Sequence, residues 1–403
     1  MASGINRDLT MKKVLIIHHG SGLGGGLIAL IGLIRELKEQ YHVSVLCIFK
    51  SDAIDYLKRE GIEVLTPKNN FFYSRYNLYI HSEASYNNPL SSFKFFYFFL
   101  LNLLNMFYFS KKEFEIYAGK FDILYLNSLF LSDWLIHSRS FFSRVIVHDR
   151  EPLAKGIMGI RKTLFRIVLN KYADVIFCVS EDNKRRINLP HKTFRVYDPV
   201  VSANRMQNKY PRTDKFKYFV YLGGSQRIKG FEQLVNSLEF LDSDIKIFFL
   251  GGIEELLENN NTLFFKIRKL FSPYLKNNLP LLKLKLEKSA RIEFIGKTDE
   301  VFDYYSQSIA VICPFSKPHA ALPILEAYSV GKPVIVSDIE GMDELYKKEI
   351  MYIFRNGDFI DLATKINSLS KYSDGDLSRI KLTALEKFKQ IYVSNPNICD
   401  LIS

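Results

Sequence analysis

A glycine-rich loop follows the first apolar run of the chain. Residues 14–17 are apolar, His18 and His19 come next, five glycines lie within residues 20–26, and a segment with helical spacing of apolar residues begins at once. Glycine lets the backbone approach a ligand closely, and the amides at a helix start attract an anion. The loop therefore predicts an anion-binding segment, with Gly22, Gly24 and Gly25 as candidate contacts.

One protein class that uses such a loop is the nicotinamide-dependent oxidoreductases. Gly20, Gly22 and Gly25 match the G-x-G-x-x-G spacing of the dinucleotide fingerprint. The next predicted strand ends at Lys50 without the acidic residue that would hold a ribose, and Asp52 comes late. An oxidoreductase is therefore the weaker alternative.

The most informative segment is residues 309–344, which has the pattern strand, loop, helix, strand, loop. Loop 316–321 delivers backbone amides at a helix start, where the helix dipole and the unpaired N–H groups would stabilise a diphosphate. Glu326 follows about one turn into that helix. Because an ionised carboxylate only accepts hydrogen bonds, it suits the two hydroxyls of a ribose. The segment predicts a site for a nucleoside diphosphate.

This segment resembles the donor-binding signature of family 4 glycosyltransferases, a large retaining group of GT-B fold that includes bacterial lipopolysaccharide and mannosyl transferases. The specific part is the Glu-Ala-x-x-x-Gly-x-Pro-Val-Ile-x-Ser-Asp core at residues 326–338. Shorter similarities follow the family's order along most of the chain, at residues 179–181, 223–224, 229–230, 294–296 and 341–344.

The resemblance implies a hexosyltransferase (EC 2.4) that moves a sugar, with retention, from a nucleotide-sugar donor to a lipid-linked or polysaccharide acceptor. The pathway would be surface polysaccharide synthesis, such as lipopolysaccharide, O-antigen or capsule. The implied catalytic residues are His148, Lys229 and Arg227. The implied donor contacts in the second half are Gly223, Gly224, His319, Ala320, Ala321, Leu322 and Glu326.

We expect neither a metal ion nor a cofactor. No Asp-x-Asp-like carboxylate pair stands at a predicted strand end, and Lys229, Arg227 and helix-terminal amides can meet the charge of the leaving group.

His148 ends the predicted strand 144–148, at the edge where ligands bind in open parallel sheets. In the family, a histidine in this place hydrogen-bonds the donor sugar near its anomeric carbon. The alternative is a loop histidine that caps a neighbouring carbonyl. His18, His19 and Asn127 are predicted at the same edge.

Two positions depart from the family pattern. Pro318 occupies the place of the first of two glutamates that the family spaces eight residues apart, and Gly223 and Gly224 occupy the place of an arginine that clamps the diphosphate. Arg227 is the candidate replacement. A catalytically silent homologue that binds a nucleotide sugar or acts as a scaffold is therefore a second hypothesis.

Parallel sheets must position these residues. Short β-branched runs alternate with amphipathic stretches in both halves of the 403-residue chain, which predicts an α/β protein. With the resemblance, we expect a GT-B fold, in which two Rossmann-like parallel-sheet domains face each other across a cleft. Periodicity is lost over residues 190–216, which contain three prolines. We predict an acceptor-binding domain at 11–205, a nucleotide-sugar-binding domain at 206–385, and a terminal helix at 386–403 that packs back on the first domain.

The formal net charge of +12 favours a polyanionic partner. Because no nucleic-acid-binding motif accompanies the charge, we expect an anionic membrane surface rather than nucleic acid. Residues 93–109 are apolar with flanking lysines, and residues 264–288 interleave Leu, Phe and Tyr with seven basic residues and one acid. The alternatives are a buried helix for the first stretch and a solvated loop for the second.

The four cysteines are far apart, and no apolar run reaches the length of a membrane-spanning helix. No secretory signal opens the chain. We therefore expect a cytoplasmic protein that binds peripherally to the inner face of the cytoplasmic membrane.

Overall fold

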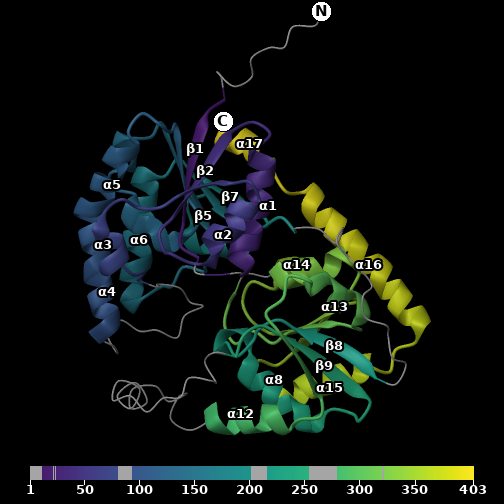
Figure 1. The fold of residues 1–403 in the computed structure, drawn as a ribbon. Helices are drawn as coiled ribbons and strands as arrows, with labels where there is room; N and C mark the ends of the chain where they lie inside the picture. Colours follow the sequence, from purple (N-terminus) through teal and green to yellow (C-terminus); the bar gives the residue numbers. More distant parts are fainter. Residues whose placement is uncertain are drawn as a thin grey trace, which may run out of the picture. The chain divides into compact units, whose positions relative to one another are not determined.

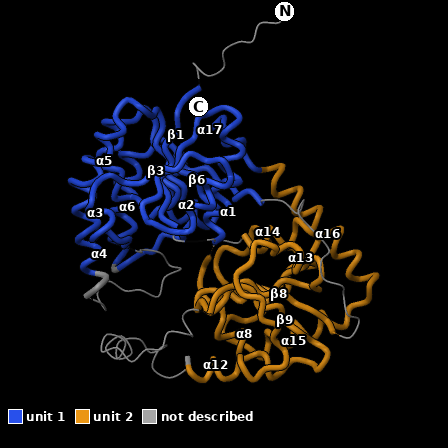
Figure 2. The backbone as a smooth tube through the Cα atoms, viewed as in Figure 1, with its two compact units in different colours: residues 1–201, 395–403 blue, residues 202–394 orange. Residues whose placement is uncertain are grey.

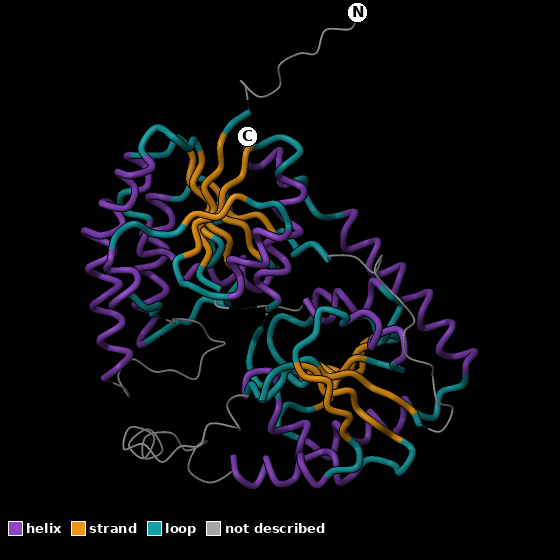
Figure 3. The backbone as a smooth tube through the Cα atoms, viewed as in Figure 1, coloured by secondary structure: helices purple, strands orange, loops and turns teal. Residues whose placement is uncertain are grey.

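The computed structural model describes residues 11–20, 22, 24–79, 93–200, 216–253, 279–319 and 322–403. The chain divides into two compact units (Figure 2). Unit 1 is Met1–Val201 with Asn395–Ser403, and unit 2 is Ser202–Ser394. Each unit has a parallel sheet with helices on both of its faces (Figure 3). The predicted α/β class with two Rossmann-like domains is thereby confirmed.

Unit 1 contains a seven-stranded sheet of order β3-β2-β1-β4-β5-β6-β7, and all neighbouring strands are parallel. Its strands are β1 (Lys13–His18), β2 (His42–Cys47), β3 (Glu63–Leu65), β4 (Ile123–Leu126), β5 (Arg144–Asp149), β6 (Val175–Cys178) and β7 (Thr193–Arg195). The central strands are nearly continuous apolar runs because helices cover both faces of the sheet.

Helices cover both faces of this sheet (Figure 1), and an apolar cluster lies on each face. One joins it to α1 (Gly25–Leu37), α2 (Asp52–Arg59) and α17 (Ile398–Ile402). The other joins it to α3 (Asn70–Ser74), α4 (Phe93–Leu104), α5 (Ser110–Tyr117) and α6 (Ile160–Tyr172). The unit also contains α7 (Glu181–Ile187), a π-helical turn η3 (Asn105–Phe109) between α4 and α5, and the 3-10 turns η4 (Leu129–Trp134), η5 (Ser138–Ser140) and η6 (Ile157–Gly159).

Unit 2 contains a six-stranded parallel sheet of order β10-β9-β8-β11-β12-β13. Its strands are β8 (Lys217–Tyr221), β9 (Ile245–Leu250), β10 (Ile292–Gly296), β11 (Val311–Cys313), β12 (Val334–Ser337) and β13 (Met351–Phe354). One face packs against α8 (Phe231–Ser237), α12 (Leu279–Lys288) and α15 (Phe359–Leu369).

The other helices of unit 2 are α13 (Val301–Gln307), α14 (Leu322–Ser329) and α16 (Asp374–Val393). Tyr304 of α13 packs on Phe248 with ring centres 5.1 Å apart, which places α13 on the opposite face from α8. The 3-10 turns of this unit are η8 (Arg227–Lys229), η9 (Leu238–Phe240) and η10 (Asp343–Leu345).

The unit boundaries differ in detail from the expected domain limits. The first boundary lies at Val201, against residue 205 in the prediction. Helix α16 runs through the second expected limit, at residue 385, and only Asn395–Ser403 belong to unit 1. There Ile398 and Ile402 join the apolar cluster that contains α1.

The structure describes all of one stretch that is expected to bind a membrane and only part of the other. Residues 93–109 form α4 and η3, whereas residues 264–278 lie outside the described residues and residues 279–288 form α12. Among the described helices, none combines the length and the apolar character needed to cross a membrane. All four cysteines are free and buried.

Candidate functional site

The carboxyl ends of three strands bring polar side chains together in unit 1. His18 ends β1, Asn127 follows β4 and Arg150 follows β5, so that all three lie at one edge of the sheet. Asn127 Nδ2 lies 3.0 Å from His18 Nδ1, and Arg150 Nε donates to Asn127 Oδ1 at 3.1 Å. Arg150 Nη1 also forms an ion pair with Asp198. The four side chains form one buried polar network.

His148 lies beside this network on β5. Its side chain is 1% exposed, and Nδ1 lies 2.7 Å from the Tyr125 hydroxyl. Among the described residues Nε2 has no hydrogen-bond partner, and it lies 3.9 Å from Asp198 Oδ1. Burial, reinforced by the charge of Arg150, holds the pKa of His148 well below its usual range, so the ring is neutral at pH 7. The carboxylate opposite Nε2 favours the tautomer with the proton on Nε2, while the Tyr125 hydroxyl donates to Nδ1.

The glycine loop lies at the same edge. A Cβ on Gly20 would lie 2.4 Å from His18 Nε2, so a side chain at this position would have to displace the His18 ring. At Gly22 and Gly24 a Cβ would meet no described heavy atom within 4 Å, so their backbone borders open space. Gly24 is the N-cap of α1, whose first residue is Gly25, and no side chain caps the helix. The first amides of α1 are therefore available to an anion.

Two more histidines of this edge are uncharged at neutral pH. Burial, followed by the charges of His19 and Arg150, lowers the pKa of His18 to about 3. Burial followed by the charge of Arg150 lowers the pKa of His19 to about 4. The edge thus offers neutral imidazoles and one buried guanidinium, which is already paired with a carboxylate.

In unit 2, Lys229 and His319 meet at the carboxyl ends of β8 and β11. Lys229 ends the turn η8, and its Nζ contacts His319 Nε2. The same Nζ lies 5.3 Å from the centre of the Phe315 ring. Ser316 ties the two loops together, since its hydroxyl donates to the Arg227 carbonyl at 2.9 Å. The structure thus joins two predicted site residues that are 90 positions apart.

Close backbone packing fixes the turn that carries Lys229. Gly230 has a φ of +81°, and a Cβ there would lie 1.6 Å from the Pro314 carbonyl oxygen. A Cβ on Gly223 would lie 2.6 Å from Cβ of Lys229, and one on Gly224, where φ is +52°, would lie 2.3 Å from a carbonyl oxygen of the loop after β9. Gly223 and Gly224 therefore have a packing role beneath Lys229.

Glu326 lies in α14, close enough to Lys229 for each charge to affect the other. Its side chain is 9% exposed, and Oε2 accepts a hydrogen bond from the Tyr305 hydroxyl at 2.9 Å. Burial raises the pKa of Glu326 to about 7, although the Tyr305 bond and the charge of Lys229 oppose the rise. Burial lowers the pKa of Lys229 to about 8. Burial and then Lys229 hold the pKa of His319 well below its usual range.

The remaining predicted donor residues of unit 2 are described only in part. Leu322 begins α14 and is buried, whereas Ala320 and Ala321 lie outside the described residues. Arg227 begins the same turn as Lys229, and its Nε lies 3.9 Å from Glu232 Oε2. We name Lys229, His319 and Glu326 the donor triad, because the structure brings these three predicted residues together.

Sequence reasoning missed four residues of these groups. Arg150 and Asp198 are 48 positions apart, and Tyr305 precedes Glu326 by 21 positions, so no local pattern connects either pair. Phe315 directly precedes the predicted loop 316–321 and was not among the candidates. The one available signal was the position of Arg150, two residues after His148, which ends the predicted strand.

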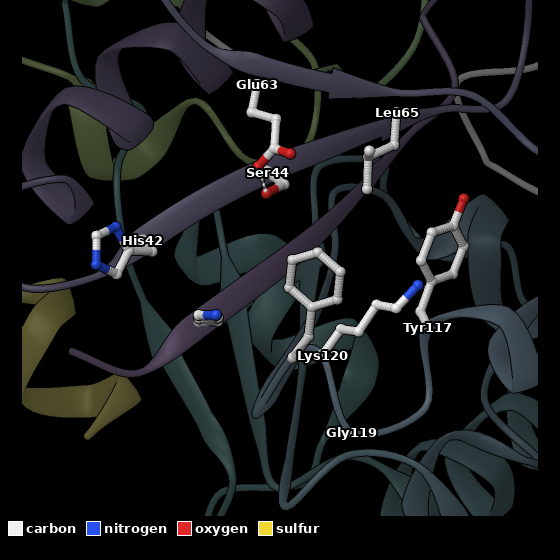
Figure 4. Close-up of a pocket in the computed structure, with 9 residues that line it drawn as sticks. His42, Ser44, Glu63, Leu65, Tyr117, Gly119 and Lys120 are labelled. Atoms are coloured by element: carbon white, nitrogen blue, oxygen red, sulfur yellow. Dashed lines mark hydrogen bonds between the residues drawn. The ribbon is translucent and has the colours of Figure 1, made fainter. Parts of the chain in front are cut away.

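A cavity of about 700 Å³ lies at the opposite edge of the unit 1 sheet (Figure 4). Its lining includes Lys13, His42 and Glu63, which begin β1, β2 and β3, together with Tyr117 and Lys120. It opens at the amino ends of the strands and is separate from the histidines described above. Within the described ranges, no group of three or more His, Cys, Asp or Glu side chains is placed to hold a metal ion.

The fold recurs in several solved structures. Anabaena HepE, solved in complex with UDP, is 16% identical, with a TM-score of 0.65 over 95% of this chain and 99% of that one. A glycosyltransferase from Rickettsia africae is 14% identical, with a TM-score of 0.60 over 94% of each chain. The lipopolysaccharide outer core galactosyltransferase WaaB is 17% identical, with a TM-score of 0.54 over 95% of this chain and 98% of that one. No curated protein gives a significant sequence match.

Two Rossmann-like parallel-sheet domains and this shared architecture define the class: the chain has the GT-B fold. Residues 202–381 match the model of the family described as glycosyl transferases group 1. The matched residues lie in unit 2 and include the donor triad, so this unit is similar in sequence to the group 1 glycosyltransferases. The match gives no support to the oxidoreductase alternative.

Proposed function

We propose that the protein is a retaining hexosyltransferase of family 4, in which unit 2 binds a nucleotide-sugar donor and unit 1 binds the acceptor. One observation carries the proposal. The donor triad gathers an amine, a neutral imidazole and a carboxyl at the carboxyl edge of the unit 2 sheet, inside the segment that matches the glycosyltransferase family. Nucleotides bind at this edge in open α/β sheets.

Lys229 is assigned to the diphosphate. Negative charge grows on the nucleoside diphosphate as the bond to the sugar breaks, so a fixed cation there stabilises the transition state more than the ground state. Its contact with His319 holds Nζ in place. Because Lys229 donates to Nε2 of this neutral ring, the imidazole keeps its proton on Nδ1 and can donate a hydrogen bond from there.

Glu326 is assigned to the ribose. The Tyr305 hydroxyl holds Oε2 and orients the carboxyl group, which leaves Oε1 to accept from a ribose hydroxyl. Arg227 is assigned a supporting role at the diphosphate. The glycine loop, at Gly22, Gly24 and Gly25, is assigned to the anionic part of the substrates. We propose that no metal ion takes part.

In unit 1, His148 is assigned a hydrogen bond from Nε2–H to the donor sugar, because this nitrogen has no hydrogen-bond partner among the described residues. Arg150 and Asp198 are positioning residues. Arg150 holds Asn127 against His18, and its charge adds to burial, the main cause, in keeping the pKa of the neighbouring imidazoles low. A neutral imidazole is a hydrogen-bond donor that adds no charge to the developing sugar cation.

The choice of substrates rests on structural neighbours. HepE was solved with UDP and with UDP-glucose, and WaaB is named a lipopolysaccharide outer core galactosyltransferase. By analogy we propose a nucleotide sugar with UDP as the first candidate, and a lipid-linked or saccharide acceptor of surface polysaccharide synthesis at the cytoplasmic face of the membrane.

The test has two stages. A thermal-shift screen with UDP, GDP, ADP and dTDP sugars identifies the donor, since a ligand at a hundred times its Kd adds about 2.7 kcal/mol of stability. The selected radiolabelled donor is then incubated with a bacterial lipid extract, and transfer of label to lipid is measured. We expect one nucleotide to stabilise the protein and label to be transferred. The proposal fails if none of the four nucleotides shifts the melting temperature.

The alternative is a silent binding homologue. Pro318 and Gly223 stand where the family has a donor-binding glutamate and an arginine, which is the specific observation in its favour. This hypothesis predicts a thermal shift with a nucleotide sugar but neither transfer nor slow hydrolysis of the donor. The proposed transferase requires at least one of these reactions.

A further inference from the structure

Helix α6 exposes a row of apolar side chains that no sequence pattern had singled out. Ile160, Leu164 and Ile167 follow helical spacing and are 57%, 57% and 59% exposed, and Met158, just before the helix, is 93% exposed. The opposite side of α6 packs on the sheet, where Leu169 is fully buried. Burial and exposure therefore divide α6 into an inner and an outer apolar face.

The charged residues of α6 and of the segment before it have one sign. Residues 152–173 contain Lys155, Arg161, Lys162, Arg166 and Lys171 but no acidic residue. Burial lowers the pKa of Lys162, and the nearby cations Arg166, Lys155 and Arg186 lower it further. These basic side chains thus lie close enough to repel one another, and an anionic partner would relieve that repulsion.

A second helix extends the same surface. Tyr79 connects α6 with α4, because its hydroxyl accepts from Arg161 Nη2 at 3.2 Å and its ring centre lies 5.3 Å from that of Phe99. Both helices lie on the same face of the unit 1 sheet (Figure 1). The exposed apolar side chains of α4 and η3 are Phe96, Tyr97, Phe99, Leu100, Leu104, Phe107 and Tyr108. We call the exposed side chains of α4, η3 and α6 the α4–α6 surface.

We propose that the α4–α6 surface docks unit 1 on an anionic lipid bilayer. Aromatic and aliphatic side chains can enter the interface between headgroups and acyl chains, while lysines and arginines beside them bind anionic headgroups. A protein partner with both acidic and basic side chains would find no acidic residue along α6 to pair with its basic ones. An anionic bilayer, in contrast, complements both the apolar and the basic parts of the surface.

The position of α6 connects this docking with the proposed function. The helix follows β5, so its first turn lies at the carboxyl end of the strand that carries His148, and only residues 150–159 separate the two elements. A bilayer against the α4–α6 surface would therefore lie beside the edge that carries His148, in the unit to which the acceptor is assigned. This part of the inference rests on the proposed function, because it takes the acceptor to be carried on a membrane lipid.

Vesicle co-sedimentation tests the docking itself. The full-length protein is mixed with vesicles of phosphatidylcholine alone or of an equimolar mixture of phosphatidylcholine and phosphatidylglycerol. We expect preferential binding to the anionic vesicles and partial release by salt. The triple variant Ile160→Gln, Leu164→Gln, Ile167→Gln should bind at least about tenfold more weakly. A matched control replaces Ile360 and Leu382 of unit 2, which are 53% and 63% exposed, by glutamine, and should bind as wild type does.

Tryptophan fluorescence supplies a second readout. The only tryptophan of the chain, Trp134, is fully buried. Leu164→Trp should therefore add an emission that shifts to the blue on anionic vesicles and is quenched by brominated lipids. The same substitution at Leu382 should show neither effect. Equal quenching at the two positions would overturn the proposal, as would equal vesicle binding by the triple variant and wild type.

Nucleotide binding separates this proposal from the proposed function. The triple variant lies outside the donor triad, so its thermal shift with the selected nucleotide sugar should equal that of wild type. If wild type binds neither vesicle and self-associates, and the triple variant is monomeric, the surface is a protein contact and the docking proposal is wrong. If wild type binds no nucleotide sugar, the proposed transferase function is refuted, and the vesicle result is unaffected.

Discussion

Replacing Lys229 by alanine tests the donor site most directly. The change removes a cation whose Nζ contacts His319 Nε2 and lies 5.3 Å from the centre of the Phe315 ring. Neither neighbour in the donor triad fully cancels this charge, because His319 is neutral and the pKa of Glu326 is about 7. The charge is therefore available to a diphosphate.

The magnitude follows from Coulomb's law. A unit charge about 4 Å from an oxyanion contributes about 4 kcal/mol at an effective dielectric constant of about 20. Part of this attraction also acts on the bound ground state. We expect the loss in the transition state to be about 3 kcal/mol, which corresponds to roughly a hundredfold lower kcat/KM.

The assay measures release of nucleoside diphosphate from the donor selected by the thermal-shift screen. Lys246→Ala is a matched control, because Lys246 is also in unit 2 and lies over an aromatic ring, with Nζ 4.4 Å from the centre of Phe216. Both variants lose a lysine and a cation–π contact, but only Lys229 belongs to the donor triad. The reasoning is refuted if Lys229→Ala, with an unchanged melting temperature, keeps kcat/KM within about twofold of wild type.

Four further predictions concern binding, pH, metal and stability. Glu326→Ala should weaken nucleotide binding by about 1 to 3 kcal/mol, measured by calorimetry, because a ribose hydroxyl loses its partner; an unchanged Kd would exclude that role. The pH profile of kcat/KM should be bell-shaped, since Glu326 gains a proton below about 7 and Lys229 loses one above about 8. In Glu326→Gln the fall of kcat/KM on the acidic side of the profile should disappear. If this fall persists, another group causes it. EDTA should leave transfer intact, and activity that is lost and then restored by magnesium or manganese would contradict the proposed leaving-group stabilisation. Asp198→Asn should lower the free energy of unfolding by about 3 to 5 kcal/mol in urea titrations, because it leaves the charge of Arg150 buried without its ion-pair partner; a loss below about 1 kcal/mol would show that the pair is dispensable.

The sequence by itself determined the fold class and the position of the segment that is expected to bind the donor. Buried parallel strands must be apolar on both faces, so the short runs rich in Val and Ile identified most strands of both sheets. The pattern at residues 309–344 consists of local features: a loop, a helix start and a carboxyl about one turn later. The sequence of this segment was therefore enough to predict that Glu326 lies on a helix, which is α14. The position of Lys229 came from the resemblance to a family.

Tertiary structure decided which side chains meet. Lys229 and His319 are 90 positions apart, and only the ends of the neighbouring parallel strands β8 and β11 bring them together. Arg150 and Asp198 are 48 positions apart and follow β5 and β7, which lie on either side of β6 in the sheet. The pKa of Glu326 likewise depends on burial under α13, which no local pattern reveals.

Tertiary structure also decided which apolar faces stay uncovered. Helical periodicity shows that Ile160, Leu164 and Ile167 share one side of α6, but it does not show whether another element covers that side. In the described part of unit 1 these side chains remain more than half exposed. The reason is physical: amphipathicity is a property of one helix, whereas burial is a property of everything that packs around it.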